Sequence, residues 1–519
     1  MAGFINLGET GYGAAGASHT KRGVKAFNAI SGSPQSDIDF NNYTLRQRCR
    51  MLYMSAPVAT SAINTNRTKM VGIGLQPSPS VDRDILGLTE EQAVEWQRRV
   101  NAEWKMFAED KNAVDALGLN NFYELEQIVV KSWLMSGDVF AVIKREEATP
   151  LHPYTLRLQL IEADRVSTPA SMSTIAYGNT TGKAEHSDNL IYDGVEVNAG
   201  GRVVAYYISD KYPDEMPFDG KDGWTRVKAI GDETGLPNIL HIMEAERADQ
   251  YRGVSILAPV IEMVLQMRRY TEAELTAAII QSYLTAWITK NTVLPGGNPL
   301  AGGDIAGVDE DSVPKEEVHG YTEQQMGPGN VLVLEDGEDV KFGEPNIPTA
   351  GFESFIKTLS KLCGAAMEMP YDVLIKEFNS SYSSAKGALE EAWETIKMRR
   401  AHLVSDFCKP VYEMWLAEAV ASGRINAPGF FTDPLIRKAW CGARWDGPAQ
   451  IHLDPTKEAE ANEKAVAHGW KTNEQIAREQ YGTDWRSNAE RLKQENELMA
   501  QVNPAPIIEK GDDDNAEDA

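Results

Sequence analysis

Nucleotide binding is the first chemistry that the sequence suggests, because two glycine-rich stretches are similar to phosphate-binding loops. Residues 11–16, Gly-Tyr-Gly-Ala-Ala-Gly, match the dinucleotide fingerprint letter for letter. That fingerprint needs a buried strand before it and a helix after it, and no helical pattern follows here. Residues 178–183 are one residue too short for a phosphate loop, and Ala184 replaces the hydroxyl that would hold magnesium. We therefore interpret the first stretch as part of a flexible arm and the second as a hairpin tip.

The acidic pairs and the cysteines give no catalytic or metal site either. Glu244 and Glu246 lie among charged residues, which is typical of solvated side chains and not of a general acid–base pair. Glu162 and Asp164 are oxygen ligands in principle, but nothing nearby completes a coordination set. The four cysteines are widely spaced and form no Cys-x-x-Cys pair, which predicts buried thiols: Cys49, Cys363, Cys408 and Cys441. We expect no enzyme, no cofactor and no metal.

The charge of the chain limits how it can handle nucleic acid. Its 519 residues carry a formal net charge of −25. A protein that grips nucleic acid tightly neutralises phosphates with a basic face. If this chain handles DNA, it must therefore do so weakly and without reading sequence. No apolar run approaches the ~18 residues of a membrane span, and the N-terminus has no secretion signature, so we expect no membrane partner.

The first half of the chain predicts an α+β domain. Apolar residues recur every three or four positions from Tyr43 until glycine ends the pattern at 71–74. The same spacing predicts helices over 89–107 and 121–136. From residue 137 to 243 the period changes to two, which indicates a β-rich region. Within it we expect strands at 139–143, 156–161, 191–195 and 203–208.

The second half is mostly helical around one break. A helical pattern from Ser255 to Thr289 predicts a rod of roughly 50 Å. Turn residues then dominate from 291 to 350, where 331–334 and 340–342 suggest a hairpin. A clean apolar stripe at 352–367 predicts the next helix. Further helices are expected at 385–421, with a kink at Pro410, and between 456 and 499.

This order of elements resembles the lambda-like family of phage portal proteins, from about Tyr43 to Met499. Blocks similar to that family occur in the expected order, and residues 379–385 are the most family-specific. Lys386 stands where the family usually has Arg. Other such blocks are Ser136–Phe140, Leu160–Val166, Arg252–Ser255, Asp454–Ala459 and Tyr481–Trp485.

The resemblance implies a portal fold with an α/β wing, a long helical stem, a small β-rich clip insertion and a helical crown. The implied parts are a flexible arm (1–35), wing (36–253), stem helix (254–290), clip (291–350), second stem helix (351–369), tunnel loop (370–384), tunnel helix and return to the wing (385–455), crown (456–500) and disordered acidic tail (501–519).

The resemblance also implies a function. Portal subunits typically form a ring of about twelve around an axial channel at one capsid vertex. The ring is the conduit for double-stranded DNA during packaging and ejection. Implied partners are the terminase large subunit, a head-completion or adaptor protein, and the major capsid and scaffold proteins. The subunit would be found in the virion, and in the host cytoplasm during assembly.

Three groups of residues are then candidates for function. The tunnel-loop candidates are Phe378, Asn379, Ser380, Ser381, Tyr382 and Ser383. Lys386 is either a basic group near the channel or a surface charge beside a helix cap, and Arg399 and Arg400 are channel or intersubunit residues, with intersubunit salt bridges favoured. The clip candidates for partner docking are Pro295, Gly296, Asp309, Glu310, Asp311, Gly327 and Pro328.

Two other classes of protein remain as alternatives. One is a capsid-associated structural or tail adaptor protein without a DNA conduit. Such an adaptor would lack paired stem helices flanking a β insertion, so the 254–368 region discriminates. The other is an enzyme such as a nuclease or a packaging ATPase, against which the failed motifs count.

Overall fold

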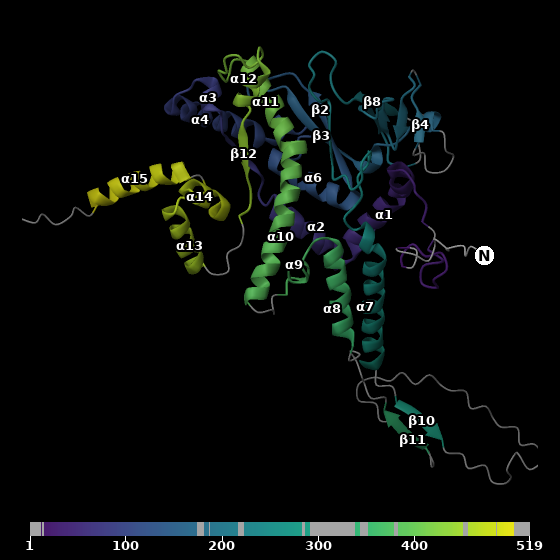
Figure 1. Ribbon diagram of the computed structural model, residues 1–519. Coiled ribbons are helices and arrows are strands. Elements are labelled where there is room, and N and C mark those ends of the chain that lie inside the picture. The colour runs from purple at the N-terminus through teal and green to yellow at the C-terminus, as the bar shows by residue number, and fades with distance from the viewer. Residues whose placement is uncertain are drawn as a thin grey trace, which may run out of the picture. The chain divides into compact units, whose positions relative to one another are not determined.

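The computed structural model describes residues 12, 15–27, 29–173, 181–185, 187–215, 223–282, 286–290, 338–342, 351–377, 382–449, 455–483 and 485–502. The chain forms two compact units, one made of Met1–Ile261 and Gly364–Ala519 and the other of Glu262–Cys363. Helices and antiparallel sheets are mixed along the chain, as expected for the α+β class (Figure 1). None of the described helices is both long and apolar enough to cross a membrane.

The first predicted helix is two helices with a break between them. A π-helical turn (Gln35–Asp39) leads into α1 (Phe40–Ser55), and α2 (Pro57–Met70) follows. Between them Ala56 is extended, with φ −119° and ψ 113°. Pro57 causes the break, because proline disfavours helical geometry in the residue before it but fits the first position of a helix. The prediction of one helix starting near Tyr43 was therefore wrong in both its start and its continuity.

The next two predicted helices are confirmed, and their ends explain why. Both α4 (Glu90–Ala108) and α6 (Phe122–Ser136) begin with a capping box, from Thr89 with Gln92 and from Asn121 with Glu124. Each box satisfies backbone N–H groups that the first helical turn leaves unpaired. Two single-turn helices flank α4, namely α3 (Arg83–Leu86) and α5 (Lys111–Val114).

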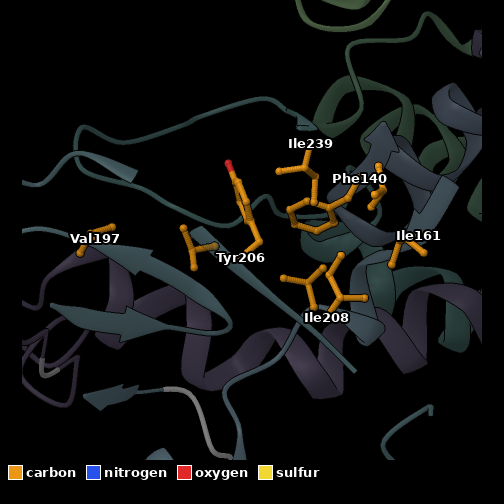
Figure 2. Close-up of a cluster of buried hydrophobic side chains, with 9 residues drawn as sticks. Phe140, Ile161, Val197, Tyr206, Ile208 and Ile239 are labelled. Carbon is orange, nitrogen blue, oxygen red and sulfur yellow. The ribbon is translucent and has the colours of Figure 1, made fainter. Parts of the chain in front are cut away.

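The predicted β-rich region is confirmed and forms two antiparallel sheets. One has the order β3-β2-β9 and the other the order β4-β5-β6-β7-β8. Nine buried residues from both sheets and the segment between them make one apolar core, of which Figure 2 labels Phe140, Ile161, Val197, Tyr206, Ile208 and Ile239. The strands are β2 (Asp138–Arg145), β3 (Leu156–Glu162), β4 (Thr181–Lys183), β5 (Leu190–Tyr192), β6 (Val195–Val197), β7 (Val203–Ser209), β8 (Trp224–Lys228) and β9 (Ile239–Met243).

The single strand expected at 191–195 is a tight hairpin. Strands β5 and β6 are joined by Asp193 and Gly194, whose φ angles are 43° and 85°. Two successive positive φ angles are typical of the turn that matches the twist of paired strands, and Asp-Gly is a favoured sequence for it. The alternating apolar residues on both sides concealed this turn in the sequence.

The second half of the larger unit begins with a short helix that was not expected. Helix α9 (Tyr371–Ile375) precedes α10 (Tyr382–Leu403), a π-helical turn (Val404–Cys408) and α11 (Lys409–Ala421). The expected irregularity at Pro410 takes the form of this π turn, because proline has no N–H to bond to the carbonyl four residues before it. Helix α12 (Pro434–Trp440) and strand β12 (Ala443–Asp446) follow, and β12 pairs with β1 (Gln76–Pro79).

An aromatic cluster joins these later elements to the earlier ones. Trp104 of α4 is in ring contact with Phe122, Tyr412, Trp415 and Trp445. These rings come from α6, α11 and β12, so the cluster fixes the second half of this unit on the first. The terminal helices expected between 456 and 499 are confirmed as α13 (Pro455–Ala467), α14 (Asn473–Tyr481) and α15 (Trp485–Val502). Residues 1–11, 13, 14 and 28 of the expected arm and residues 503–519 of the expected tail lie outside the described residues.

The smaller unit holds two helices and a β-hairpin. Its chain order is α7 (Ile261–Ser282), β10 (Ala286–Lys290), β11 (Glu338–Phe342) and α8 (Phe352–Ala366). The rod expected from Ser255 to Thr289 is thus shorter, about 33 Å for 22 helical residues. Its last predicted stretch, Ala-Trp-Ile-Thr-Lys, pairs antiparallel with β11 instead. Of the hairpin expected between 331–334 and 340–342, the second strand lies within β11 and the first lies outside the described residues.

Candidate functional site

The segment between α8 and α10 contains the residues expected to face a channel. Of these, 378–381 lie outside the described residues, whereas Tyr382 and Ser383 are the first two residues of α10. The expected loop over 370–384 is wrong at both ends, since α9 occupies its start and α10 begins before Ala385. Pro370 directly precedes α9, a position that proline suits because the first helical N–H groups have no partner. Every clip residue named above lies outside the described residues.

Helix α9 and the residues directly after it are held by two hydrogen bonds. The Ser61 hydroxyl of α2 donates to the carbonyl oxygen of Leu374 at 2.6 Å. Tyr371 donates to the carboxylate of Glu377, also at 2.6 Å. Val373 and Leu374 are buried. The residues before 378 are therefore held by α2 and by α9 itself.

Lys386 belongs to the outer surface of α10. Its ammonium lies 3.8 Å from the carboxylate of Glu390 one helical turn later, and both side chains are about half exposed. Glu391 and Glu394 are exposed on the same helix, and Glu394 pairs with Lys397 at 2.8 Å. This outward face is acidic overall, and the geometry favours the surface-charge interpretation of Lys386.

Arg399 is buried inside its own subunit. Its guanidinium lies 3.0 Å from Glu368 and 4.0 Å from Glu244, and it donates to Asn66 Oδ1 at 3.2 Å. Burial lowers the pKa of Arg399, and the two glutamates oppose that effect. Within the chain Arg399 thus pairs with these two glutamates, and about 5% of its side chain is exposed. The expected intersubunit salt bridge stays a prediction.

Arg400 is also engaged inside the subunit, where it donates to backbone oxygens. Its Nε donates to the Met70 carbonyl at 2.9 Å, and its Nη2 donates to those of Lys69 and Pro448 at 2.8 and 2.9 Å. The first two are among the last four carbonyls of α2, which have no partner inside that helix. Arg400 therefore caps the end of α2, and the channel or intersubunit role expected for it stays a prediction.

A buried ionic cluster sits where the chain leaves the sheets for α7. Arg252, fully buried, lies 2.6 Å from Asp138 of β2 and 2.8 Å from Asp193 of the β5–β6 turn. Arg46 of α1 approaches the same two carboxylates at 3.7 and 3.1 Å. Burial alone would raise the pKa of Asp138, but the two arginines hold it well below its usual range. Separating these residues would leave a buried charge without its partner, which is strongly unfavourable. The cluster therefore holds α1, β2 and the β5–β6 turn in fixed positions relative to the segment before α7.

The backbone around this cluster is packed as tightly as glycine allows. A β-carbon on Gly253 would lie 1.9 Å from the carbonyl oxygen of Gly137, and one on Gly137 would lie 2.5 Å from the backbone of Gly253. The Gly253 N–H donates to Asp138 at 3.1 Å. Sequence reasoning singled out both segments only as family-like blocks. Gly137 precedes Asp138 and Gly253 follows Arg252, so each glycine stands beside one member of the ion pair. The two glycines are 116 positions apart, and only the fold brings them together.

The weak chemical candidates of the sequence are accounted for by ordinary contacts. Glu162 and Asp164 both pair with Arg50, at 3.6 and 2.5 Å. No group of residues that could hold a metal ion occurs in the part of the chain that the structure describes. All four cysteines are buried and free, which confirms that prediction. Residues 181–183 of the second glycine-rich stretch form strand β4. Residues 178–180 of that stretch and residues 11, 13 and 14 of the first lie outside the described residues.

Comparison with known proteins gives the family. The model of the family "Phage portal protein, lambda family" matches residues 20–400. Portal protein B of Escherichia phage lambda is 23% identical over 431 residues, which cover 80% of this chain and 76% of that protein. The portal protein of Escherichia phage N15 is 23% identical over 432 residues, covering 80% and 77%.

Solved structures that are similar in outline include the neck of an empty gene transfer agent particle, computed with C6 symmetry. It has a TM-score of 0.42 and 13% identity, and the alignment covers 84% of this chain and 92% of that one. A HK97-family phage portal protein from Corynebacterium diphtheriae has a TM-score of 0.29 and 12% identity, with coverage of 79% and 96%. Because the family model spans well over half of the chain, the chain belongs to the lambda family of phage portal proteins.

Proposed function

We propose that this chain is the subunit of a ring-shaped portal at one capsid vertex. The ring is the conduit for double-stranded DNA during packaging and ejection. It is also the docking platform for the terminase large subunit and for a head-completion protein. Capsid and scaffold proteins surround it during assembly in the host cytoplasm. The family match over residues 20–400 supports this reading.

The arrangement of the smaller unit is the observation that carries the proposal. Along the chain, α7 and α8 flank two paired strands, in which Ala286 pairs with Phe342 and Lys290 with Glu338. The two helices contact each other through Tyr270, whose ring lies 5.4 Å from Phe352 and 5.2 Å from Phe355. Paired helices around a β insertion are expected of a portal stem and clip. An adaptor without a conduit would lack them.

The parts of the portal follow from this assignment. Helices α7 and α8 form the stem, and the residues between β10 and β11 belong to the clip, which docks the packaging motor and later the head-completion protein. The sheets with α1, α2, α4 and α6 form the wing. Residues 376–381 form the tunnel loop, and α13 to α15 form the crown.

The charge of the chain suits a conduit that does not hold its cargo. Each bound phosphate would slow translocation, and a chain of net charge −25 repels the DNA backbone overall. The exposed glutamates of α10 agree with that, since this helix directly follows the tunnel loop. DNA contact is thus weak and independent of sequence. We further propose that the chain hydrolyses no nucleotide and that the terminase supplies the energy.

Removal of the tunnel loop tests the proposal. Replacing residues 378–381 by Gly-Ser-Gly-Ser keeps the chain length and spares α9 and α10, and deleting the four residues is the stronger variant. We expect heads that contain the variant portal but package or retain much less DNA, measured by nuclease-protected DNA per head. A matched control is Lys397→Met on the outer face of α10, for which we expect normal heads. Normal DNA-filled heads from the deletion variant would refute the assignment of this loop.

A further inference from the structure

The residues that follow β12 are closely packed between α10 and the segment that follows α2. A β-carbon on Gly447 would lie 2.5 Å from the Leu75 side chain and 3.2 Å from the guanidinium carbon of Arg400. A β-carbon on Gly72, whose φ is +60°, would lie 2.5 Å from the ring of Pro448. The positive φ of Gly72 and the absence of a side chain at both positions allow this close approach. We call residues 447–448 the connector, since the chain continues from them to α13.

Arg400 holds the connector to two helices at once. Its guanidinium is planar, and its N–H groups point in fixed directions. One edge donates to the Met70 and Lys69 carbonyls at the end of α2, while Nη2 also donates to the Pro448 carbonyl of the connector. The guanidinium carbon lies 5.1 Å from the centre of the ring of Trp393, which is about two turns earlier on α10. A single side chain thus joins α2, α10 and the connector.

The terminal helices return to the same place. A β-carbon on Gly482, in the turn between α14 and α15, would lie 3.7 Å from the Gly447 carbonyl oxygen. By contrast, the terminal helices are otherwise poorly buried, and Ala477 is the one buried residue among those described in 455–502. The terminal helices also reach the rest of the unit through ion pairs between partly or fully exposed side chains, namely Arg98 with Glu490, Arg486 with Glu90 and Arg444 with Glu474. Exposed pairs of this kind contribute little.

We propose that Arg400 is a positioning residue that couples the loop-bearing helix α10 to the terminal helices by fixing the connector. The proposal rests on the proposed function, in which α10 positions the tunnel loop and the terminal helices form the crown. Displacement of α10 is then transmitted to the crown through the Arg400–Pro448 contact, and displacement of the crown reaches the loop by the same route.

Hydrogen–deuterium exchange of purified protein tests the coupling without any assay of DNA. Arg400→Met removes all donors but keeps an aliphatic side chain against Trp393. We expect exchange in 443–449 and in α14 to rise about tenfold or more, because charge-assisted hydrogen bonds are lost. Exchange in β7 should stay unchanged. Lys397→Met, on the exposed face of the same helix, is the matched control and should change neither region. Unchanged exchange in 443–449, or an equal rise throughout the larger unit, would overturn the proposal.

Arg400→Lys separates positioning from folding. An ammonium keeps the charge but cannot reach the two carbonyls of α2 and that of Pro448 in the fixed fork geometry. We expect this variant to fold, to form portal-containing heads and to package less DNA than the wild type, with a smaller rise in exchange than Arg400→Met. Wild-type packaging by Arg400→Lys and by Arg400→Met together would contradict the coupling. Failure of the wild-type chain itself to form rings would instead count against the proposed function.

Discussion

At the scale of single residues, the buried Arg252 connects several elements of the larger unit, although no catalytic or binding motif in the sequence includes it. Besides Asp138 and Asp193, it donates to the carbonyls of Val166 and Ala163 at 2.8 Å each. These partners come from both sheets, and Arg46 brings α1 to the same carboxylates. In the sequence, Asp138, Asp193 and Arg46 are residue types that usually lie at the surface. Their meeting depends on the packing of distant strands, which no local pattern encodes.

Removing this arginine should cost more than removing an exposed one. For Arg252→Met we expect the free energy of unfolding to fall by about 3–5 kcal/mol, because Asp138 would remain buried without its main partner. Urea denaturation followed by circular dichroism measures the change. The control is Arg247→Met, which breaks a half-exposed pair with Asp37 and should cost about 1 kcal/mol or less. Equal costs for the two variants would show that the cluster does not organise the unit.

A second residue of the cluster predicts a pH dependence. Burial raises the pKa of Asp39 to about 7, and the negative charges of Asp193 and Asp138 add to that effect. The positive charges of Arg252 and Arg46 oppose it. The imidazole of His241 also faces this cluster, beside Asp138. The folded chain therefore binds this proton more tightly than the unfolded chain. The stability that Asp39 contributes is present at low pH and is lost as the pH rises from about 4 to about 7.

Asp39→Asn tests the sign of that effect. The variant should remove a negative slope of at most about 1.4 kcal/mol per pH unit between pH 4 and 7 from the free energy of unfolding. The slope above about pH 8 should stay the same, because Asp39 is ionised there in the folded and in the unfolded chain. Denaturation at a series of pH values measures both slopes. A variant with the same slope as the wild type between pH 4 and 7 would show that Asp39 is ionised throughout.

At the scale of elements, the helices that were predicted accurately are those whose ends are marked by local sequence signals. Helices α4 and α6 have capping boxes and a regular apolar face, and both were found within one residue of their expected bounds. The stretch 286–290 was misassigned because a short apolar run fits a helix as well as a strand, and its partner lies some fifty residues further along the chain. The missed turn at Asp193–Gly194 was encoded locally and could have been predicted from Asp-Gly.

The contact between the start of β2 and the segment before α7 gives an element-scale prediction. Gly253→Ala should lower the free energy of unfolding by about 1–3 kcal/mol, because its β-carbon would meet backbone atoms of Gly137 that have no room to move. Urea denaturation is again the measurement. Gly387→Ala in α10 is a control of opposite sign, since nothing lies within 4 Å and alanine favours a helix. A neutral Gly253→Ala variant would mean that the two segments separate easily.

At the scale of the whole molecule, composition excluded more than it identified. The net charge of −25 argued against a tight DNA grip, and the widely spaced cysteines against a metal site or disulfides. The candidate site was only partly predictable. The family resemblance pointed to the segment before α10, and residues 378–381 of it lie outside the described residues. The contacts of Arg399 and Arg400 inside the chain depend on where α2 and the connector lie, which no local pattern encodes.

Assembly into a ring with an open centre is the central claim of the proposed function. Negative-stain electron microscopy of the purified chain, classified by projection, tests it most directly. The account predicts end-on views of closed rings of about a dozen subunits around a hole wide enough for duplex DNA. Compact closed particles without a central channel would contradict it and would favour an adaptor protein.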